Sequence, residues 1–130
     1  MIEFPVRTGQ RTEFVDITAQ VQAAVVELGL ENGAVVVFNP HTTAAVTINE
    51  GADPDVVRDM AAALDKLVPW RDDYHHAEGN SAAHIKSSFF GSSVLVPVAG
   101  GRLQLGTWQT VWFCDFDGPR QRRCQVSSVA

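Results

Sequence analysis

The order of strand-like and helix-like segments limits how this chain can fold more than any other feature of its sequence. Strand patterns dominate both ends, and turn signals such as Gly100-Gly101 separate the last of them. The regular alternation of strands and helices that a parallel sheet requires is missing. At 130 residues, the chain has the size of one domain. We therefore expect a single α+β domain over residues 1–130, with an antiparallel β-sandwich-like core, two main helices and one short helix.

Eight segments have the alternation or the β-branched composition of strands. They are Ile2–Val6, Glu13–Ile17, Ala34–Phe38, Ala44–Ile48, Ser92–Val98, Arg102–Leu105, Thr107–Phe116 and Arg122–Val129. The first two are expected to form a hairpin and the last four a β-meander. The third lacks alternation, which predicts a strand buried on both faces, and the fourth is expected to be its neighbour across the Pro40–Thr43 turn.

Three segments have apolar residues at helical spacing. They are Ala19–Leu28, the stretch from Pro54 to the residue before Pro69, and Ser81–Phe90. Thr18, Asp53 and Asn80 precede them as expected N-caps. The middle helix carries an apolar stripe, predicted to be its buried face, formed by Val56, Met60, Leu64 and Leu67.

Composition narrows the range of partners. The net charge of −5, with histidines neutral, disfavours binding to nucleic acid, which needs a basic footprint. We find no stretch with the length of a membrane span or the pattern of a secretory signal, so we expect no membrane partner and a cytoplasmic location. Cys114 and Cys124 are too few for a disulfide framework and are expected to be reduced, packing residues.

Histidines are the first candidates for a functional site. His41 follows a predicted buried strand in a turn whose geometry requires no imidazole. The other three histidines all lie between Tyr74 and His84. A helix over the third helical segment would place His84 on a polar face with Ser88. The alternatives are a structural histidine at His41 and a solvated loop that carries incidental histidines.

A metal site is one use for these side chains. His41, His76 and His84 would supply three nitrogen ligands with an open fourth position. Their spacing matches neither a zinc finger nor a zinc-binding helix, so separate segments would have to assemble the site.

Further polar residues are candidates for catalysis and anion binding. Asn49 and Glu50 lie where a strand leaves the sheet, and Glu50 is either a general base, a partner for a histidine or a surface carboxylate. Hydroxyl groups, one ammonium group and glycine-freed amides suit phosphate oxygens. They belong to Lys86, Ser87, Ser88 and the Gly106–Gln109 turn with Thr107 and Gln109. Arg120, Arg122 and Arg123 are interpreted as a solvated basic strand end, with Arg120 as an alternative phosphate contact.

Three blocks together resemble a known family. HTTAAVTINEGADPDV, YHHAEGNSAAHIKSS and LGTWQTVWFCDFDGPR are similar in order and spacing to the YjbQ-like family, whose members are often named secondary thiamine-phosphate synthase enzymes. The resemblance covers roughly Gly33 to Arg123. It implies a compact α+β fold centred on a β-sandwich, a homotrimer and a metal-capable histidine site.

The resemblance also implies roles for individual residues. The metal ligands are His41, His76 and His84, with zinc as the first choice of metal and Mg²⁺ as the alternative. Asn49, Glu50 and Glu78 match the family pattern, and we predict them as the catalytic residues. The residues that bind substrate phosphate are Lys86, Ser87, Ser88, Thr107 and Gln109. His75 is an additional histidine relative to the family pattern and leaves open which of the adjacent pair faces the site.

Three functions follow as hypotheses. The first is a metal-binding enzyme acting on small phosphorylated or diphosphorylated molecules, with a thiamine-phosphate synthase side activity as the resemblance implies. The second is a metal-dependent phosphoester hydrolase, which would use water as the acceptor. The third is a non-enzymatic ligand-binding trimer, in which Trp108, Trp112 and Phe113 mainly bury an interface.

Overall fold

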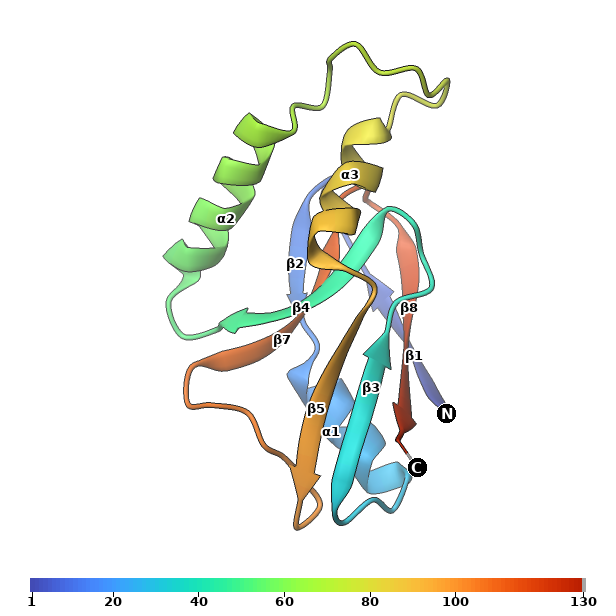
Figure 1. Ribbon diagram of the computed structural model, residues 1–130, viewed down its shortest axis with the longest axis vertical. Helices are drawn as coiled ribbons and strands as arrows, with labels where there is room; N and C mark the ends of the chain where they lie inside the picture. Colours follow the sequence, from blue (N-terminus) through green and yellow to red (C-terminus); the bar gives the residue numbers. More distant parts are fainter. Residues whose placement is uncertain (130) are drawn as a thin grey trace.

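Two antiparallel sheets and three helices make up the computed structural model, which describes residues 1–129 (Figure 1). One sheet has the strand order β1-β8-β3-β5-β6, and the other has the order β2-β7-β4. The strands are β1 (Ile2–Arg7), β2 (Glu13–Asp16), β3 (Gly33–Phe38), β4 (Ala44–Glu50), β5 (Ser93–Ala99), β6 (Arg102–Leu103), β7 (Gln109–Asp115) and β8 (Gln121–Ser128). The helices are α1 (Thr18–Glu27), α2 (Pro54–Leu67) and α3 (Ser81–Phe90). The predicted α+β class is confirmed.

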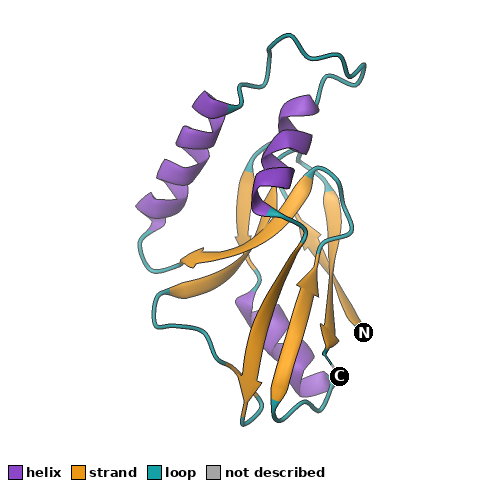
Figure 2. Cartoon of the chain, viewed as in Figure 1, coloured by secondary structure: helices purple, strands orange, loops and turns teal. Residues whose placement is uncertain are grey.

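The main core forms where residues of both sheets and of α1 pack together (Figure 2). Val35 and Val37 of β3, together with Val21 and Val25 of α1, are fully buried there. The expectation that β3 is buried on both faces is wrong, because Phe38 is 40% exposed. The sheet face that carries Phe38 also carries Leu95, which is 62% exposed. The run of valines therefore reflects the strand's β-propensity, not burial on both sides.

The expected strand pairings are wrong in three places. β1 pairs with β8 and β2 with β7, so no hairpin joins β1 to β2. β3 and β4 lie in different sheets, and among the last four strands only β5 and β6 form a hairpin. In each case the connecting loop crosses from one sheet to the other, and a local pattern of residues does not encode that crossing.

Helix boundaries follow the sequence more closely than strand pairing does. Asp53 caps α2 as expected, because its side chain accepts a hydrogen bond from the Asp55 N–H at 2.9 Å. Thr18 is not a cap: it is the first residue of α1, and its Oγ1 accepts the N–H of Val111 at 3.0 Å. Asn80 occupies the N-cap position of α3 but makes no side-chain cap hydrogen bond.

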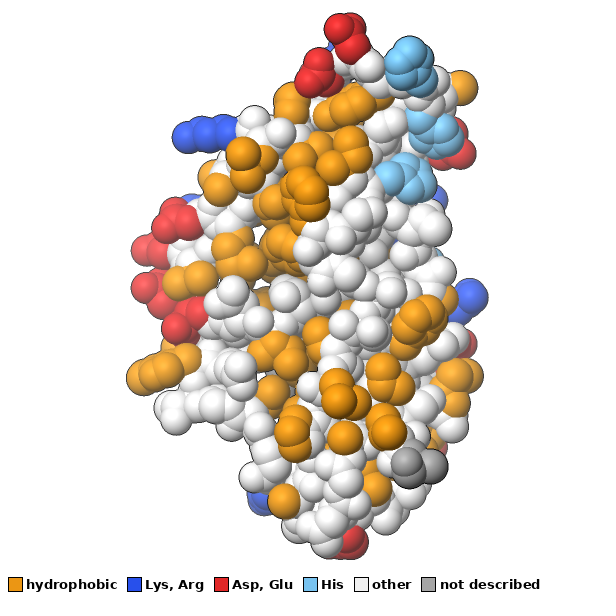
Figure 3. All heavy atoms as spheres, viewed as in Figure 1, with side chains coloured by type: hydrophobic (Ala, Val, Ile, Leu, Met, Phe, Trp, Pro, Cys, Tyr) orange, Lys and Arg blue, Asp and Glu red, His pale blue; other side chains and the backbone are white. Residues whose placement is uncertain are grey.

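α2 lies along the outside of the molecule (Figure 1). Within its apolar stripe Leu64 is buried and Val56 and Met60 are half-buried, whereas Leu67 is 74% exposed. Lys86 of α3 reaches across to form a hydrogen-bonded ion pair with Asp65. Figure 3 shows apolar side chains gathered along this side of the molecule, between α2 and α3. None of the helices among residues 1–129 is long and apolar enough to cross a membrane.

A histidine-lined cavity as candidate functional site

Three connections meet at one end of the fold and line an open cavity of about 420 Å³, which we call the histidine cavity. They are the loop between β3 and β4, the start of α3 with the loop before it, and the loop between β7 and β8. Its lining includes His41, His76, Glu78, Asn80, His84 and Arg120. The structure thus brings the three predicted metal ligands to one cavity from separate segments.

Asn39 holds the loop that carries His41. Its side-chain oxygen accepts the His41 N–H at 3.0 Å, and its amide nitrogen donates to the Ala44 carbonyl at 2.6 Å and to the His41 carbonyl at 3.1 Å. Asn39 is only 1% exposed, so these bonds satisfy its polar atoms inside the protein. The sequence indicated a turn here, but it did not show that this one side chain closes the loop on both sides.

The ring of His41 is held by its Nε2 atom, which accepts the backbone N–H of Arg123 at 3.0 Å. A neutral imidazole has one acceptor nitrogen, so this bond places the proton on Nδ1. Burial lowers the pKa of His41, and the positive charge of Arg122 lowers it further. His41 is therefore held neutral, with Nδ1–H as its remaining donor.

A buried ion pair supports this loop from below. The guanidinium of Arg122 donates to both carboxylate oxygens of Asp115, at 2.8 and 3.1 Å, and to Thr43 Oγ1 at 2.8 Å. Burial would raise the pKa of Asp115, but hydrogen bonds from Arg122, the Asp117 backbone and Thr8 outweigh it and lower the pKa. The interpretation of Arg122 as part of a solvated strand end is wrong, because it is 6% exposed. Its sequence neighbours Arg120 and Arg123 are exposed, so composition alone did not distinguish it.

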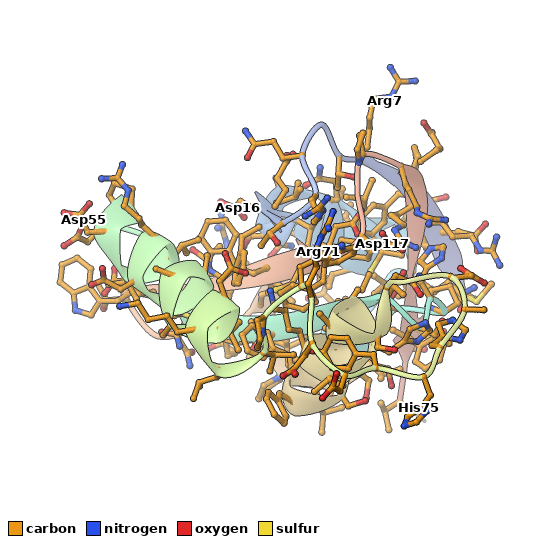
Figure 4. All side chains as sticks on the ribbon, turned by 90° about the horizontal axis from the view of Figure 1, so that it is seen from above. Arg7, Asp16, Asp55, Arg71, His75 and Asp117 are labelled. Carbon is orange, nitrogen blue, oxygen red and sulfur yellow. The ribbon has the colours of Figure 1, made fainter. Side chains whose placement is uncertain are left out.

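His76 and His84 face each other across the entrance of the histidine cavity. Their ring centroids are 5.4 Å apart and the rings meet edge to face. Glu78 Oε1 lies 4.0 Å from His76 Nε2. Figure 3 shows the neighbouring histidines gathered at this end of the molecule. In Figure 4, His75 lies at the outer edge of the molecule, whereas Asp117 lies over the body of the fold. His76, not His75, lines the histidine cavity.

The His76 and His84 rings lie at a separation that two ligands of one zinc ion would have. With zinc–nitrogen bonds of about 2 Å, two imidazoles on adjacent tetrahedral positions have centroids roughly 5 Å apart, which matches the His76–His84 pair. His41 would have to release the Arg123 N–H to offer Nε2 as a third ligand. Within residues 1–129 the side chains form no preassembled group of three or more metal-binding residues. The His76–His84 pair therefore fits two ligands of one divalent metal, whereas His41 Nε2 is engaged by the Arg123 N–H.

The predicted phosphate-binding residues are dispersed. Ser87 and Ser88 line an adjoining cavity of about 530 Å³, the serine cavity, which shares His41 and His84 with the histidine cavity. Lys86 is 3% exposed and is engaged by Asp65, away from both cavities. Thr107 and Gln109 also lie outside both linings, in and after the loop that leads to β7. Periodicity placed Lys86 near the serines but did not reveal that α2 covers it.

Asn49 and Glu50 lie at the other end of β4. Their strand partners are Thr110 and Gln109, whereas the histidine cavity adjoins Ala44, paired with Asp115. Six residues of strand separate the two ends by roughly 20 Å. Glu50 Oε2 accepts the N–H groups of Ala52 at 2.8 Å and of Asp53 at 3.3 Å, so it shapes the turn before α2. These two residues are not part of the histidine cavity.

The sequence did not single out Asp117 or the second role of Asn80. The Asn80 amide nitrogen donates to Asp117 Oδ2 at 2.9 Å, which joins the start of α3 to the β7–β8 connection. Arg120 donates to the same Asp117 oxygen at 2.9 Å. No spacing rule connects residues 37 positions apart. The Asp117-Gly118 turn was the only available signal, and it pointed to a loop.

Comparisons with known proteins agree on one family. The fold and the cavity define this protein as a small α+β domain with a histidine-lined cavity at one end of its sheets. The family model described as "UPF0047 protein YjbQ-like" matches residues 2–130. The protein YugU of Bacillus subtilis is 51% identical over 95% of both chains, and MJ1081 of Methanocaldococcus jannaschii is 43% identical over 99% of this chain and 94% of its own. The chain belongs to the YjbQ-like UPF0047 family.

Solved structures of relatives share the fold. A YjbQ/UPF0047 protein of Clostridium acetobutylicum is 51% identical, with a TM-score of 0.97 over 99% of this chain and 100% of its own. The protein TT1486 of Thermus thermophilus is 42% identical, with a TM-score of 0.91 over 99% of this chain and 100% of its own. The names of these relatives state a family and no activity, so the function has to be argued from the cavity.

Proposed function

We propose that this protein is an enzyme that binds a divalent metal at the histidine cavity and acts on a small phosphorylated or diphosphorylated molecule. The observation that carries the proposal is the facing pair His76 and His84, which shares a cavity with His41. Zinc is the first candidate metal because its preferred ligands include imidazoles in an open three-ligand set, and Mg²⁺ is the alternative. When bound, such a metal supplies Lewis acidity toward a phosphate oxygen.

The residues around the metal would hold and move protons. Glu78, with a side chain 70% exposed beside His76, is placed to orient that ring or to exchange a proton with a substrate. Without metal, His41 Nε2 accepts the Arg123 N–H and Nδ1–H is a donor; as the third metal ligand, His41 would give up the bond to Arg123. The end of β4 that carries Asn49 and Glu50 lies away from the cavity. If these residues, predicted from the sequence as catalytic, act on a ligand, that ligand must bind at their own end of the strand.

Metal content tests this assignment most simply. We expect wild-type protein equilibrated with Zn²⁺ and then desalted to retain the metal, and His76→Ala and His84→Ala to lose most of it. His75→Ala is the matched control, because it removes the neighbouring histidine at the outer edge and should retain zinc as the wild type does. Equal zinc in the wild type and all three variants would exclude the histidine pair as ligands.

The reaction itself separates into two forms of the proposal. Transfer to a thiazole phosphate, as in a thiamine-phosphate synthase side activity, requires a second substrate, whereas hydrolysis uses water. Incubation with a diphosphate substrate, with and without a thiazole phosphate, distinguishes them. Product that needs the thiazole supports transfer, and phosphate release without it supports hydrolysis.

We also propose a cytoplasmic homotrimer as the working state. The exposed apolar residues support it, since patches of this kind mark interfaces. They include Phe38, Leu67, Phe89 and Leu95. Light scattering after gel filtration checks the assembly, and a monomer at micromolar concentration would contradict it. A trimer whose melting temperature responds to no metal or phosphate would instead favour the non-enzymatic binding module.

A further inference from the structure

The histidine cavity and the serine cavity adjoin each other, and we call the two together the groove. His41, Thr42 and His84 line both of them, so a ligand longer than a phosphate can occupy the two at once. The serine cavity contains Ser87 and Ser88, and the histidine cavity contains Arg120. The hydrogen-bonding groups that remain free differ between the two ends.

Two of the three serine hydroxyls in the serine cavity, those of Ser87 and Ser88, are left as acceptors. The Ser87 hydroxyl donates its hydrogen to the Ala83 carbonyl at 2.8 Å, and the Ser88 hydroxyl donates to the His84 carbonyl at 3.0 Å. A hydroxyl has one hydrogen, so both oxygens are left with lone pairs only. The Gly91 N–H in the same lining is bonded to the Ser87 carbonyl at 2.9 Å. A phosphate dianion, whose oxygens are acceptors, meets the wrong partners in these serines.

The histidine cavity offers donors. Arg120 Nε donates to the Asp117 carbonyl at 2.8 Å, and Nη2 donates to Asp117 Oδ2 at 2.9 Å. These bonds fix the guanidinium while using two of its five N–H groups, so three remain for an anion. Thr43 Oγ1 accepts from Arg122 and keeps its own hydrogen to donate. Arg120 is 51% exposed at the side chain, which leaves it open to a ligand.

Two carboxylates also line this end and oppose an anion. Asp117 is offset by Arg120 and by the Asn80 amide, which donates to Oδ2 at 2.9 Å. Glu78 is mostly exposed and lies beside His76, where a bound divalent cation would offset its charge. The anion therefore belongs between Arg120 and the histidine pair.

We propose that the groove binds a phosphorylated ligand in one orientation, with the phosphoryl group against Arg120 and a body rich in hydroxyl or amino groups donating to Ser87 and Ser88. This inference rests on the proposed function and narrows its substrate class. It replaces Lys86 and the two serines with Arg120 as the phosphate-binding residue, and it makes the serines selective for the rest of the molecule.

The test uses three probes on Zn²⁺-equilibrated protein: inorganic phosphate, ribose 5-phosphate and ribose, each titrated by calorimetry. Arg120→Gln is expected to weaken phosphate and ribose 5-phosphate about tenfold or more, because it removes a charged bidentate donor. Ser87→Ala with Ser88→Ala is expected to leave phosphate within about twofold and to weaken ribose 5-phosphate about fivefold. Arg7→Gln and Ser93→Ala, which lie outside both linings, are the matched controls.

The outcomes separate this inference from the proposed function. If Arg120→Gln leaves the phosphate affinity unchanged, or if the serine substitutions lower it as much, the proposed orientation is wrong. The protein would still be a phosphate-binding enzyme. Ribose binding through the serines with no phosphate binding at all overturns the proposed function and the phosphoryl half of the orientation together. Binding of none of the probes overturns both proposals.

Discussion

The two ends of β4 carry similar polar residues but use them differently. At the end of β4 that begins with Ala44, His41 and the residues around it face a cavity and keep hydrogen-bonding groups free. At the other end, the carboxylate of Glu50 is already bound to backbone N–H groups of the turn before α2. A polar side chain that finds its partners within a few residues has a structural explanation. Polar groups that converge from distant segments and keep hydrogen-bonding capacity free, as His41 and Arg120 do, are the better candidates for a site.

Crowding at the far end supports a structural role. Gly51 has no room for a side chain beside Thr110, so the chain turns tightly there. Trp112 Nε1 donates to the Glu50 carbonyl at 3.1 Å, and the Asn49 side chain accepts the Glu50 N–H at 2.7 Å. This end is a packed turn, whereas the histidine end is hollow.

The largest expected effect comes from removing the ion pair beneath the histidine end. Arg122→Met leaves Asp115 buried at 0% exposure without its charged partner, and we expect a loss of about 3–5 kcal/mol in the free energy of unfolding. Urea denaturation measures it. Arg120→Met is the matched control, because its exposed pair with Asp117 should contribute less than about 1 kcal/mol. Equal losses in both variants would contradict the distinction between the buried and the exposed arginine.

Asn39 is expected to come second. Asn39→Ala leaves the Ala44 carbonyl and the His41 N–H without their side-chain partner. We expect this to lower the free energy of unfolding by roughly 2–3 kcal/mol. Since the same bonds position the His41 loop, metal affinity should fall as well. Circular dichroism melts and zinc titration check the two effects. A destabilised variant with unchanged zinc affinity would show that the loop is structural and does not contribute to the site.

The neutral state of His41 predicts a smaller, pH-dependent effect. Its folded pKa is lowered from the ordinary value of 6.5, so the unfolded chain binds more protons as the pH falls below 6.5. The contribution to stability is therefore complete above 6.5 and is lost as the pH falls toward the folded pKa. We expect this contribution of His41 to the free energy of unfolding to be less than about 1 kcal/mol, because the ring is partly exposed and solvent screens its charge.

His41→Gln isolates this contribution, because a side-chain amide oxygen can still accept the Arg123 N–H without titrating. The urea midpoint should fall between pH about 7.5 and pH about 5.5, and this fall should be larger in the wild type than in the variant. Parallel losses in the two proteins would assign the acid sensitivity to other groups.

The far end should respond least. Glu50→Gln keeps an oxygen for the N–H groups of Ala52 and Asp53, so we expect a change within about 0.5 kcal/mol and unchanged zinc content. Denaturation and metal analysis check both. Zinc lost from this variant would place Glu50 in the site and remove the contrast between the two ends of β4.

The sequence was most informative where the physics is local. Asp53 and Pro54 marked the start of α2, and helical spacing put His84 and Ser88 at the same cavity in α3. Strand partners were not predictable, because the partners lie far apart in the sequence; the β1–β2 loop, for example, is held by Thr8, whose hydroxyl donates to Asp115 at 2.7 Å. Lys86 could not be separated from its serine neighbours without knowing that α2 lies against it.

Anomalous diffraction from zinc-soaked crystals tests the central claim most directly. We expect one zinc peak within bonding distance of His76 and His84, with the His41 ring turned toward it. A peak at the Glu50 end of β4, or zinc bound only by His75 at the outer edge, would contradict the assignment of the histidine cavity as the functional site.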